Sequence, residues 1–245
     1  MKIQYISDIH LEFYEDVLQI PIVPSAPVLC LLGDISYPDS KNYDFLLNWA
    51  SNNYEKVFII SGNHEYYSKI SYSEINEIIK KKVSKYENIT FLNNKIEEYK
   101  GYTFIGCTLW SNIPNHLSNY QLNPYNDLKK IKDMNREIYN SLHSRDVKFL
   151  EDNISKYKNI ICLTHHLPSN ELVHDIYKNS ANFMFATDLN YLIDSKYIKA
   201  WLCGHSHKGN TKIINNVLCS LNPFGYPNEN KENDIKNIIS KFIEI

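Results

Sequence analysis

Glycine and arginine are scarce in this sequence. Only 7 of the 245 residues are glycine, whereas glycine usually makes up about 7% of a protein. We therefore expect the remaining glycines to lie where the backbone needs a positive φ angle or a close approach. The only arginines are Arg136 and Arg145, and the net charge is −2. This charge leaves no basic surplus for non-specific binding, so nucleic acid is not favoured as a partner.

The sequence also lacks long apolar runs and paired cysteines. No apolar stretch approaches the roughly 20 residues of a membrane span, and the first run, Ile3–Ile6, is too short for a signal peptide. The five cysteines are an odd number and form no Cys-x-x-Cys pair. Four of them lie within apolar runs: Cys30, Cys107, Cys162 and Cys203. These features predict reduced, buried cysteines in a cytoplasmic protein without a membrane partner.

Five short apolar runs are each followed by polar residues that can bind a metal ion. The runs contain mainly β-branched and aliphatic residues without alternation, which is typical of strands buried on both faces. They are Ile3–Ile6, Val28–Leu32, Val57–Ile60, Ile160–Leu163 and Ala200–Cys203. We expect all five to be strands.

Helical patterns lie between these runs. Ser71 and Glu74 have the spacing of a capping box, and the apolar stripe that follows predicts a helix over residues 73–85. A shorter helix is expected around Phe45–Trp49 and a longer one over residues 134–154, broken near Ser144. Strands that alternate with helices indicate an α/β sheet covered on both faces.

The remaining segments predict a hairpin, a closing strand and one irregular insertion. Asn215-Asn216 is a plausible turn between strands at Thr211–Ile214 and Val217–Ser220. The last residues, Ile238–Ile245, fit a closing strand or a helix, and the strand is favoured. Residues 110–131 form a loop-rich insertion, and loops of this length are usually functional or disordered. No linker composition marks a boundary, so we expect a single domain over residues 1–245.

The polar residues after the strands form a candidate metal site. Open α/β sheets bind ligands beyond the carboxyl ends of their strands. The candidate ligands are Asp8, His10, Asp34, Asn63, His165, His205 and His207. Seven ligands suit two divalent ions about 3.5–4 Å apart that share a carboxylate, and Asp34 stands alone at its strand end as the natural bridge. Because the donors are nitrogen and oxygen without cysteine, manganese is expected first, with iron, zinc or nickel as alternatives.

Other histidines and lysines are better explained by ordinary structure. His116, His143 and His174 lie in polar loop or helix contexts, where a satisfied structural histidine is the common case. A cluster of four lysines closes the helix predicted over residues 73–85, where cations oppose the negative end of the helix dipole. The lysines are Lys80, Lys81, Lys82 and Lys85. A solvated helix terminus therefore explains them better than nucleic-acid contact.

Five ordered motifs resemble those of the calcineurin-like metallophosphoesterase superfamily. They are Asp8-Ile9-His10, Gly33-Asp34, Gly62-Asn63-His64-Glu65, Thr164-His165-His166 and Gly204-His205-Ser206-His207. Further stretches resemble the small bacterial and viral phosphohydrolases of that superfamily: Thr108–Ser111, Asn126-Asp127 and Asn222–Pro227. The resemblance implies a four-layer α/β/β/α sandwich, in which two mixed β-sheets are flanked by helices.

The resemblance also implies a role for each site residue. The first ion would be held by Asp8, His10 and His207, and the second by Asn63, His165 and His205, with Asp34 between them. His64 would be the general acid, with Glu65 expected to orient it. The family pattern prefers His165 over His166 as a ligand, whereas chemistry alone leaves the two open. Expected substrate contacts are Asn63, His64, His166 and Tyr66, and Tyr67 also neighbours the site.

The activity implied is a dinuclear-metal-dependent hydrolysis of small phosphoric esters by a metal-bridging hydroxide. Diesters of small or nucleotide type are favoured, because neither arginine lies near a motif to clamp a dianionic monoester, and Phe224 stands where relatives often have arginine. The alternatives are a phosphomonoesterase, a nuclease of the same superfamily, and a non-catalytic scaffold with this fold. A scaffold would be free to lose His64 and the ligands, yet all are present.

Overall fold

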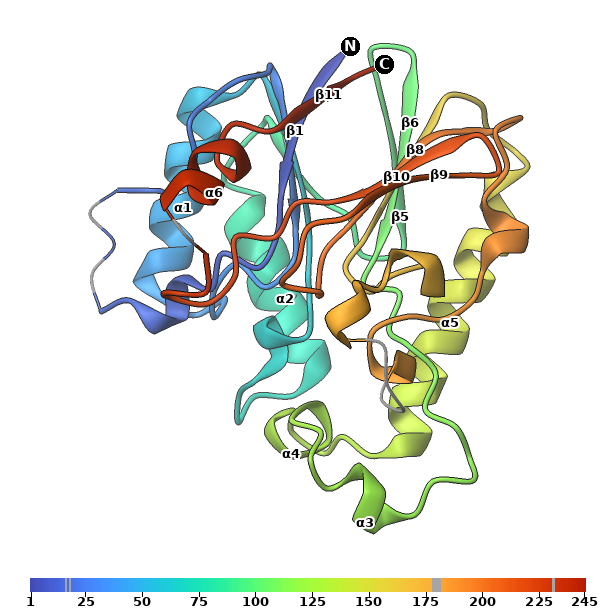
Figure 1. Ribbon diagram of the computed structural model, residues 1–245. Helices are drawn as coiled ribbons and strands as arrows, with labels where there is room; N and C mark the ends of the chain where they lie inside the picture. Colours follow the sequence, from blue (N-terminus) through green and yellow to red (C-terminus); the bar gives the residue numbers. More distant parts are fainter. Residues whose placement is uncertain (16, 18, 178–181, 231) are drawn as a thin grey trace.

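Two β-sheets pack face to face at the centre of the protein (Figure 1). The structure is a computed structural model that describes residues 1–15, 17, 19–177, 182–230 and 232–245. The first sheet has the strand order β11 (Phe242–Glu244), β1 (Lys2–Ile6), β2 (Val28–Leu32), β3 (Lys56–Ile60) and β4 (Ile89–Phe91). Its strands are parallel except β11, which runs antiparallel to β1 and brings the two chain ends together.

The second sheet has six strands. Their order is β5 (Lys95–Tyr99), β6 (Tyr102–Cys107), β7 (Ile160–Thr164), β8 (Ile198–Cys203), β10 (Val217–Leu221) and β9 (Thr211–Ile214). The four inner strands are parallel, and both edge strands are antiparallel to their neighbours. Both sheets are therefore mixed, as expected.

Helices cover the outer face of each sheet. Helices α1 (Lys41–Asn53) and α2 (Tyr72–Val83) lie on the first sheet, and α5 (Arg136–Ile154) lies on the second (Figure 1). The shorter helices are α3 (Asn119–Leu122), α4 (Asp127–Lys130) and α6 (Glu232–Ile238). Six 3₁₀ turns cover Leu11–Phe13, His64–Tyr66, Asn170–Leu172, Asp175–Tyr177, Asn182–Met184 and Asn190–Leu192. The predicted four-layer sandwich is confirmed.

Successive side chains along each strand point to opposite faces of the sheet. They form one core between the two sheets and further cores between each sheet and its helices. Phe58 and Phe104, one from each sheet, stack with ring centroids 3.9 Å apart in the core between the sheets. Their strand neighbours Val57 and Ile59 face the helices instead. Because both faces are covered, the strands show continuous apolar runs rather than polar alternation.

The five apolar runs are confirmed as strands β1, β2, β3, β7 and β8. Helix α2 begins with the predicted capping box between Ser71 and Glu74. The predicted hairpin is confirmed, with Asn215 and Asn216 at φ 48° and 63°, the left-handed conformation that asparagine tolerates. All five cysteines are free and the four within apolar runs are buried, as expected, and Cys219 is buried as well.

Three expectations about elements need correction. Helix α5 is continuous from Arg136 to Ile154 and is not broken near Ser144, whose hydroxyl donates to the Asn140 carbonyl one turn earlier. The closing strand expected within Ile238–Ile245 is present but shorter, at Phe242–Glu244, and helix α6 precedes it and ends at Ile238. Strands β4, β5 and β6 were not predicted; β5 is half exposed and lies at a sheet edge, so it has no continuous apolar run.

Among the described residues, no helix combines the length and the apolar character needed to cross a lipid bilayer.

Candidate metal centre

The proposed ligands follow strands of both sheets, and the chain approaches itself closely where they meet. A Cβ atom on Gly62 would lie 2.2 Å from Asp34 Oδ1 and 2.6 Å from His165 Cε1. A Cβ atom on Gly33, whose φ is +85°, would lie 2.4 Å from the Gly62 nitrogen. Only glycine fits at these two positions, which explains why a sequence poor in glycine retains it here.

Four of the proposed ligands have left-handed backbone conformations. Their φ angles are 54° at Asp8, 52° at His10, 54° at Asp34 and 66° at His205. Such conformations are uncommon outside glycine and persist only where the surrounding structure enforces them. Their concentration in one place is typical of a functional site.

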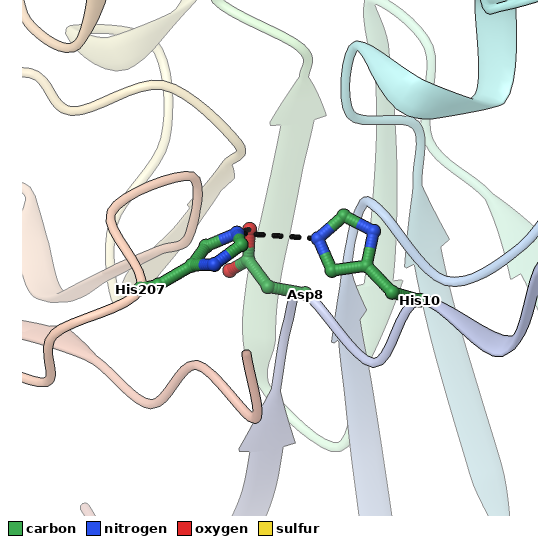
Figure 2. Close-up of side chains that lie close together, drawn as sticks. All are labelled: Asp8, His10 and His207. Carbon is green, nitrogen blue, oxygen red and sulfur yellow. Dashed lines mark hydrogen bonds and ion pairs between the residues drawn. The ribbon is translucent and has the colours of Figure 1, made fainter. Parts of the chain in front are cut away.

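The first ligand group consists of Asp8 and His10 after β1 and His207 after β8 (Figure 2). Their ligand atoms lie within 4.8 Å of one another. His10 Nε2 is 3.2 Å from His207 Nε2, which is 3.6 Å from Asp8 Oδ1. Asp8 Oδ1 is buried and has no hydrogen-bond partner in the part of the chain that the structure describes. A buried carboxylate oxygen without a donor, facing two ring nitrogens, fits a bound cation.

The second group consists of Asp34, His165 and His205, whose ligand atoms also lie within 4.8 Å of one another. His165 Nε2 is 3.4 Å from Asp34 Oδ2 and 3.2 Å from His205 Nδ1. Asn63 Oδ1 lies 3.0 Å from the same His165 nitrogen. This group can therefore offer four donors to one ion.

Asp34 lies between the two groups. Its Oδ2 atom is 3.9 Å from His10 Nε2 and 3.4 Å from His165 Nε2. Burial alone would raise the pKa of Asp34, but His165 and His64 outweigh it and hold the pKa well below its usual range. The carboxylate is therefore an anion placed within reach of both groups.

The outward nitrogen of each ligand histidine already has an acceptor. His10 Nδ1 is 2.8 Å from Glu12 Oε1, and His207 Nδ1 is 2.6 Å from Glu229 Oε2. His165 Nδ1 lies 2.8 Å from the Leu32 carbonyl, and His205 Nε2 lies 3.1 Å from the Met184 carbonyl. Each acceptor holds a proton on that nitrogen and leaves the inward nitrogen as a lone pair, which is how proteins orient metal-binding histidines. The residues present therefore fit divalent ions.

His64 lies beside the two groups, and both of its ring nitrogens contact residues that are not proposed ligands. Its Nδ1 is 2.9 Å from Glu12 Oε1, and its Nε2 is 3.2 Å from the Tyr226 hydroxyl. Burial lowers the pKa of His64, but the carboxylates of Asp34 and Glu12 outweigh this and raise it. A protonated imidazole in this position can donate a proton to a departing oxygen.

Glu65 has a different environment from the one expected. The carboxylate that contacts the His64 ring is Glu12, whereas Glu65 accepts backbone N–H bonds from Asp34, Ile35 and Gly62 at 2.7–3.0 Å. Burial and then the charge of Asp34 raise the pKa of Glu65 to about 7. Glu65 thus secures the backbone on which Asp34 stands.

Two expected substrate contacts lie away from the cavity beside the ligands. Tyr66 is buried in the core, where its hydroxyl donates to Asn76 Oδ1. His166 is buried behind His205, with ring centroids 4.1 Å apart, and its Nε2 lies 3.3 Å from the Tyr139 hydroxyl. Burial, reinforced by His205 and His165, lowers the pKa of His166 well below its usual range.

A cavity of about 370 Å³ opens beside the ligand groups. Asn63, His64 and Asp34 form its polar floor. Its walls carry several aromatic side chains: Tyr67, Tyr125, Tyr177, Phe185 and Tyr226. No lysine or arginine occurs among the described residues that line it.

Three site residues were not predicted from the sequence: Glu12, Asp127 and Tyr226. The sequence feature that could have indicated Glu12 is its place two residues after His10, a proposed ligand in the first motif. Asp127 Oδ1 accepts hydrogen bonds from the Asn63 amide at 2.8 Å and the Tyr67 hydroxyl at 2.6 Å. These contacts orient the Asn63 amide so that its oxygen faces His165.

One known protein family matches most of this chain. The model of the family described as calcineurin-like phosphoesterase matches residues 1–209. The chain belongs to this family. It is a metal-dependent phosphohydrolase, as the five motifs indicated.

This phosphohydrolase is similar in sequence to one viral protein and in fold to one solved bacterial structure. It is 31% identical over 259 residues to the uncharacterized protein L509 of Acanthamoeba polyphaga mimivirus, covering 93% of this chain and 92% of that protein. The crystal structure of phosphopantetheinyl hydrolase (PptH) from Mycobacterium tuberculosis superposes with a TM-score of 0.67 at 14% identity. That superposition covers 92% of this chain and 90% of the other, and it shows that the fold is shared.

Proposed function

We propose that this phosphohydrolase is a dinuclear-metal phosphodiesterase that acts on small diesters, including those with a nucleotide-type arm. The observation that carries the proposal is the charge of the cavity, which has carboxylates and imidazoles but no lysine or arginine among its described lining residues. A dianionic monoester presents three peripheral oxygens that enzymes usually clamp with arginine. A diester carries one negative charge and needs no such clamp.

Both arginines are already engaged elsewhere. Arg136 donates to the backbone carbonyls of Asn115 and Leu117. Arg145 lies 2.8 Å from Asp146 and also contacts the Tyr72 hydroxyl. Neither side chain is free to meet a phosphate, which supports the preference for diesters.

The chain's residues divide the catalytic work between them. Asp8, His10 and His207 would hold one ion, Asn63, His165 and His205 the other, with Asp34 shared by both. When bound, such ions neutralise charge on the phosphoryl oxygens and lower the pKa of coordinated water. His64 would donate a proton from Nε2 to the departing alkoxide, because Glu12 already occupies Nδ1.

Manganese is the proposed resident metal, with iron, zinc or nickel as alternatives that the donor set also fits. Imidazole, carboxylate and amide oxygen together suit ions such as manganese, iron, zinc or nickel, and no cysteine belongs to the ligand groups of the described residues. The buried free cysteines support a reducing, cytoplasmic location. Small phosphoesters are therefore the proposed partners, and polymeric nucleic acid is less favoured because no lysine or arginine occurs among the described residues that line the cavity.

The test compares kcat/KM for bis-nitrophenyl phosphate and nitrophenyl phosphate at one pH with saturating manganese. We expect the diester to be hydrolysed more efficiently. A clear preference for the monoester would reject the proposal in favour of a phosphomonoesterase. Faster cleavage of single-stranded DNA than of any small diester would favour a nuclease.

A further inference from the structure

One buried carboxylate contacts both a proposed metal ligand and the proposed general acid. Glu12 lies in the 3₁₀ turn after β1, and its side chain is 1% exposed. Its Oε1 atom is 2.8 Å from His10 Nδ1 and 2.9 Å from His64 Nδ1. The two rings follow different strands, β1 and β3, and their centroids are 4.4 Å apart.

We propose that Glu12 is a positioning residue that orients His10 as a metal ligand and His64 as the general acid through one shared oxygen. The inference rests on the proposed function, because it assumes that His10 binds an ion and that His64 donates a proton. The inference adds one residue, Glu12, on which both the metal binding by His10 and the proton donation by His64 depend.

The contacts of Glu12 differ from those of a carboxylate that stabilises a loop. Glu65 accepts three backbone N–H bonds, whereas the contacts of Glu12 within the described chain are the two imidazoles. Glu12 Oε2 is buried and has no hydrogen-bond partner among the described residues. Burying a carboxylate with one unpaired oxygen is unfavourable, so a loop-stabilising role does not explain this arrangement.

Glu12 accepts a hydrogen bond from Nδ1 of both His10 and His64, and it thereby fixes a proton on that nitrogen of each ring. A proton on His10 Nδ1 leaves Nε2 as a lone pair directed at His207 and Asp8. A proton on His64 Nδ1 leaves Nε2 to carry the proton that is transferred. In that step a hydroxide oxygen forms a new P–O bond, the P–O bond to the leaving group breaks, and the leaving oxygen takes the Nε2 proton. The neutral ring keeps its Nδ1 proton, which stays hydrogen-bonded to Glu12. Solvent then restores the Nε2 proton.

The contact with His10 and the contact with His64 predict different effects of the substitution Glu12→Gln, which keeps the size of the side chain. Through His10, affinity for the first ion should fall about 10–100-fold in calorimetric titration with manganese, a typical loss when the partner of a metal-binding histidine is changed. Through His64, kcat should fall more for diesters with an alkyl leaving group than for those with nitrophenolate, since only a basic leaving oxygen needs the proton.

Glu229→Gln is the matched control. Glu229 contacts the ligand His207 and not His64, so this substitution should weaken ion binding without changing the dependence on the leaving group. A double-mutant cycle with His64→Ala makes the distinction quantitative. The extra loss that Glu12→Gln causes with alkyl leaving groups should disappear in the His64→Ala background, whereas the effect of Glu229→Gln should persist.

Several results would overturn the inference. If Glu12→Gln lowers kcat equally for all leaving groups, and this loss is additive with that of His64→Ala, the link to His64 is rejected. If Glu12→Gln leaves the manganese affinity unchanged, the link to His10 is rejected. If Glu12→Gln fails to fold, the ¹⁵N spectrum of the wild-type histidines loaded with diamagnetic zinc gives the same test, because a proton on Nε2 of His10 in the zinc-loaded protein contradicts the proposed tautomer. A wild-type protein that binds manganese but hydrolyses no ester would instead overturn the proposed function.

Discussion

The fold constrains the backbone at the proposed ligands. Asp8, His10 and Asp34 have positive φ angles, each of which costs about 1–3 kcal/mol and persists only under constraint from neighbouring structure. Part of that constraint is the backbone contact between Gly33 and Gly62. The residues therefore form a preorganised site, and small changes around it should have large effects on ion binding.

Gly62→Ala tests this constraint. The new methyl group would overlap Asp34 Oδ1 and His165 Cε1, so we expect loss of at least one ion and a lower melting temperature. Gly209→Ala is the control, because its Cβ would meet no atom closer than 3.6 Å. Metal analysis and thermal unfolding give the metal content and the melting temperature of both variants. Equal values for Gly62→Ala and Gly209→Ala would contradict the proposed constraint at Gly62.

Asp34→Asn tests the shared ligand. The substitution removes the only carboxylate within reach of both His10 and His165 among the described ligand groups, so we expect fewer than two ions per chain and strongly reduced activity. Metal stoichiometry of the purified variant is the measurement. Two tightly bound ions together with full activity would reject the bridging role.

His64→Ala tests the general acid. Both ions should remain bound, and kcat should fall by about 10²–10⁴-fold with basic leaving groups and less with nitrophenolate. Steady-state kinetics over a series of leaving groups provides the measurement. An equal loss across the series would indicate that His64 positions the phosphate instead, and loss of metal would make it a ligand.

At the scale of elements, the irregular segment between β6 and α5 contributes to the site. Asp127 begins helix α4, and its buried carboxylate holds the Asn63 amide and the Tyr67 hydroxyl. The neighbouring Tyr125 and Asn126 line the cavity. The expected insertion-like loop thus orients a ligand that follows β3 and forms part of the substrate wall.

Asp127→Ala should weaken the second ion selectively. Without the carboxylate, the Asn63 amide is free to rotate its oxygen away from His165, and we expect about 10–100-fold lower affinity for one ion. Manganese titration should show the other ion bound as in the wild type. Asp133→Asn, an exposed change in the same region, is the control. Equal weakening of both ions by Asp127→Ala would contradict the assignment.

At the scale of the whole molecule, the centre joins the two sheets. Its ligands follow β1, β2 and β3 in one sheet and β7 and β8 in the other. Buried carboxylates and imidazoles gather between them, so ions that bind only the folded protein should stabilise the packing of the sheets.

Metal removal should therefore lower the melting temperature of the whole protein. An ion present at 100 times its Kd stabilises the folded state by about 2.7 kcal/mol. Calorimetric unfolding with and without a chelator measures the difference, and the shift should be reversed by adding manganese back. A melting temperature unaffected by chelation would show that the centre holds no ion under these conditions.

The sequence by itself determined the buried strands and the polar residues that follow them. Strands covered on both faces need continuous apolar runs, and parallel strands bring their carboxyl ends to one edge. The positions of Asp8, Asp34 and His205 therefore followed from local pattern alone. The edge strand β5 left no such pattern, because an exposed edge imposes little on residue type.

Only the tertiary structure decided which side chains meet. His165 and His166 follow the same strand, and packing turns the first towards Asp34 and the second towards Tyr139. The contact between Glu12 and His64 joins residues 52 positions apart. Tyr66, although next to the motif, turns into the core. Such outcomes depend on side-chain packing between elements distant in sequence, and local periodicity carries no information about it.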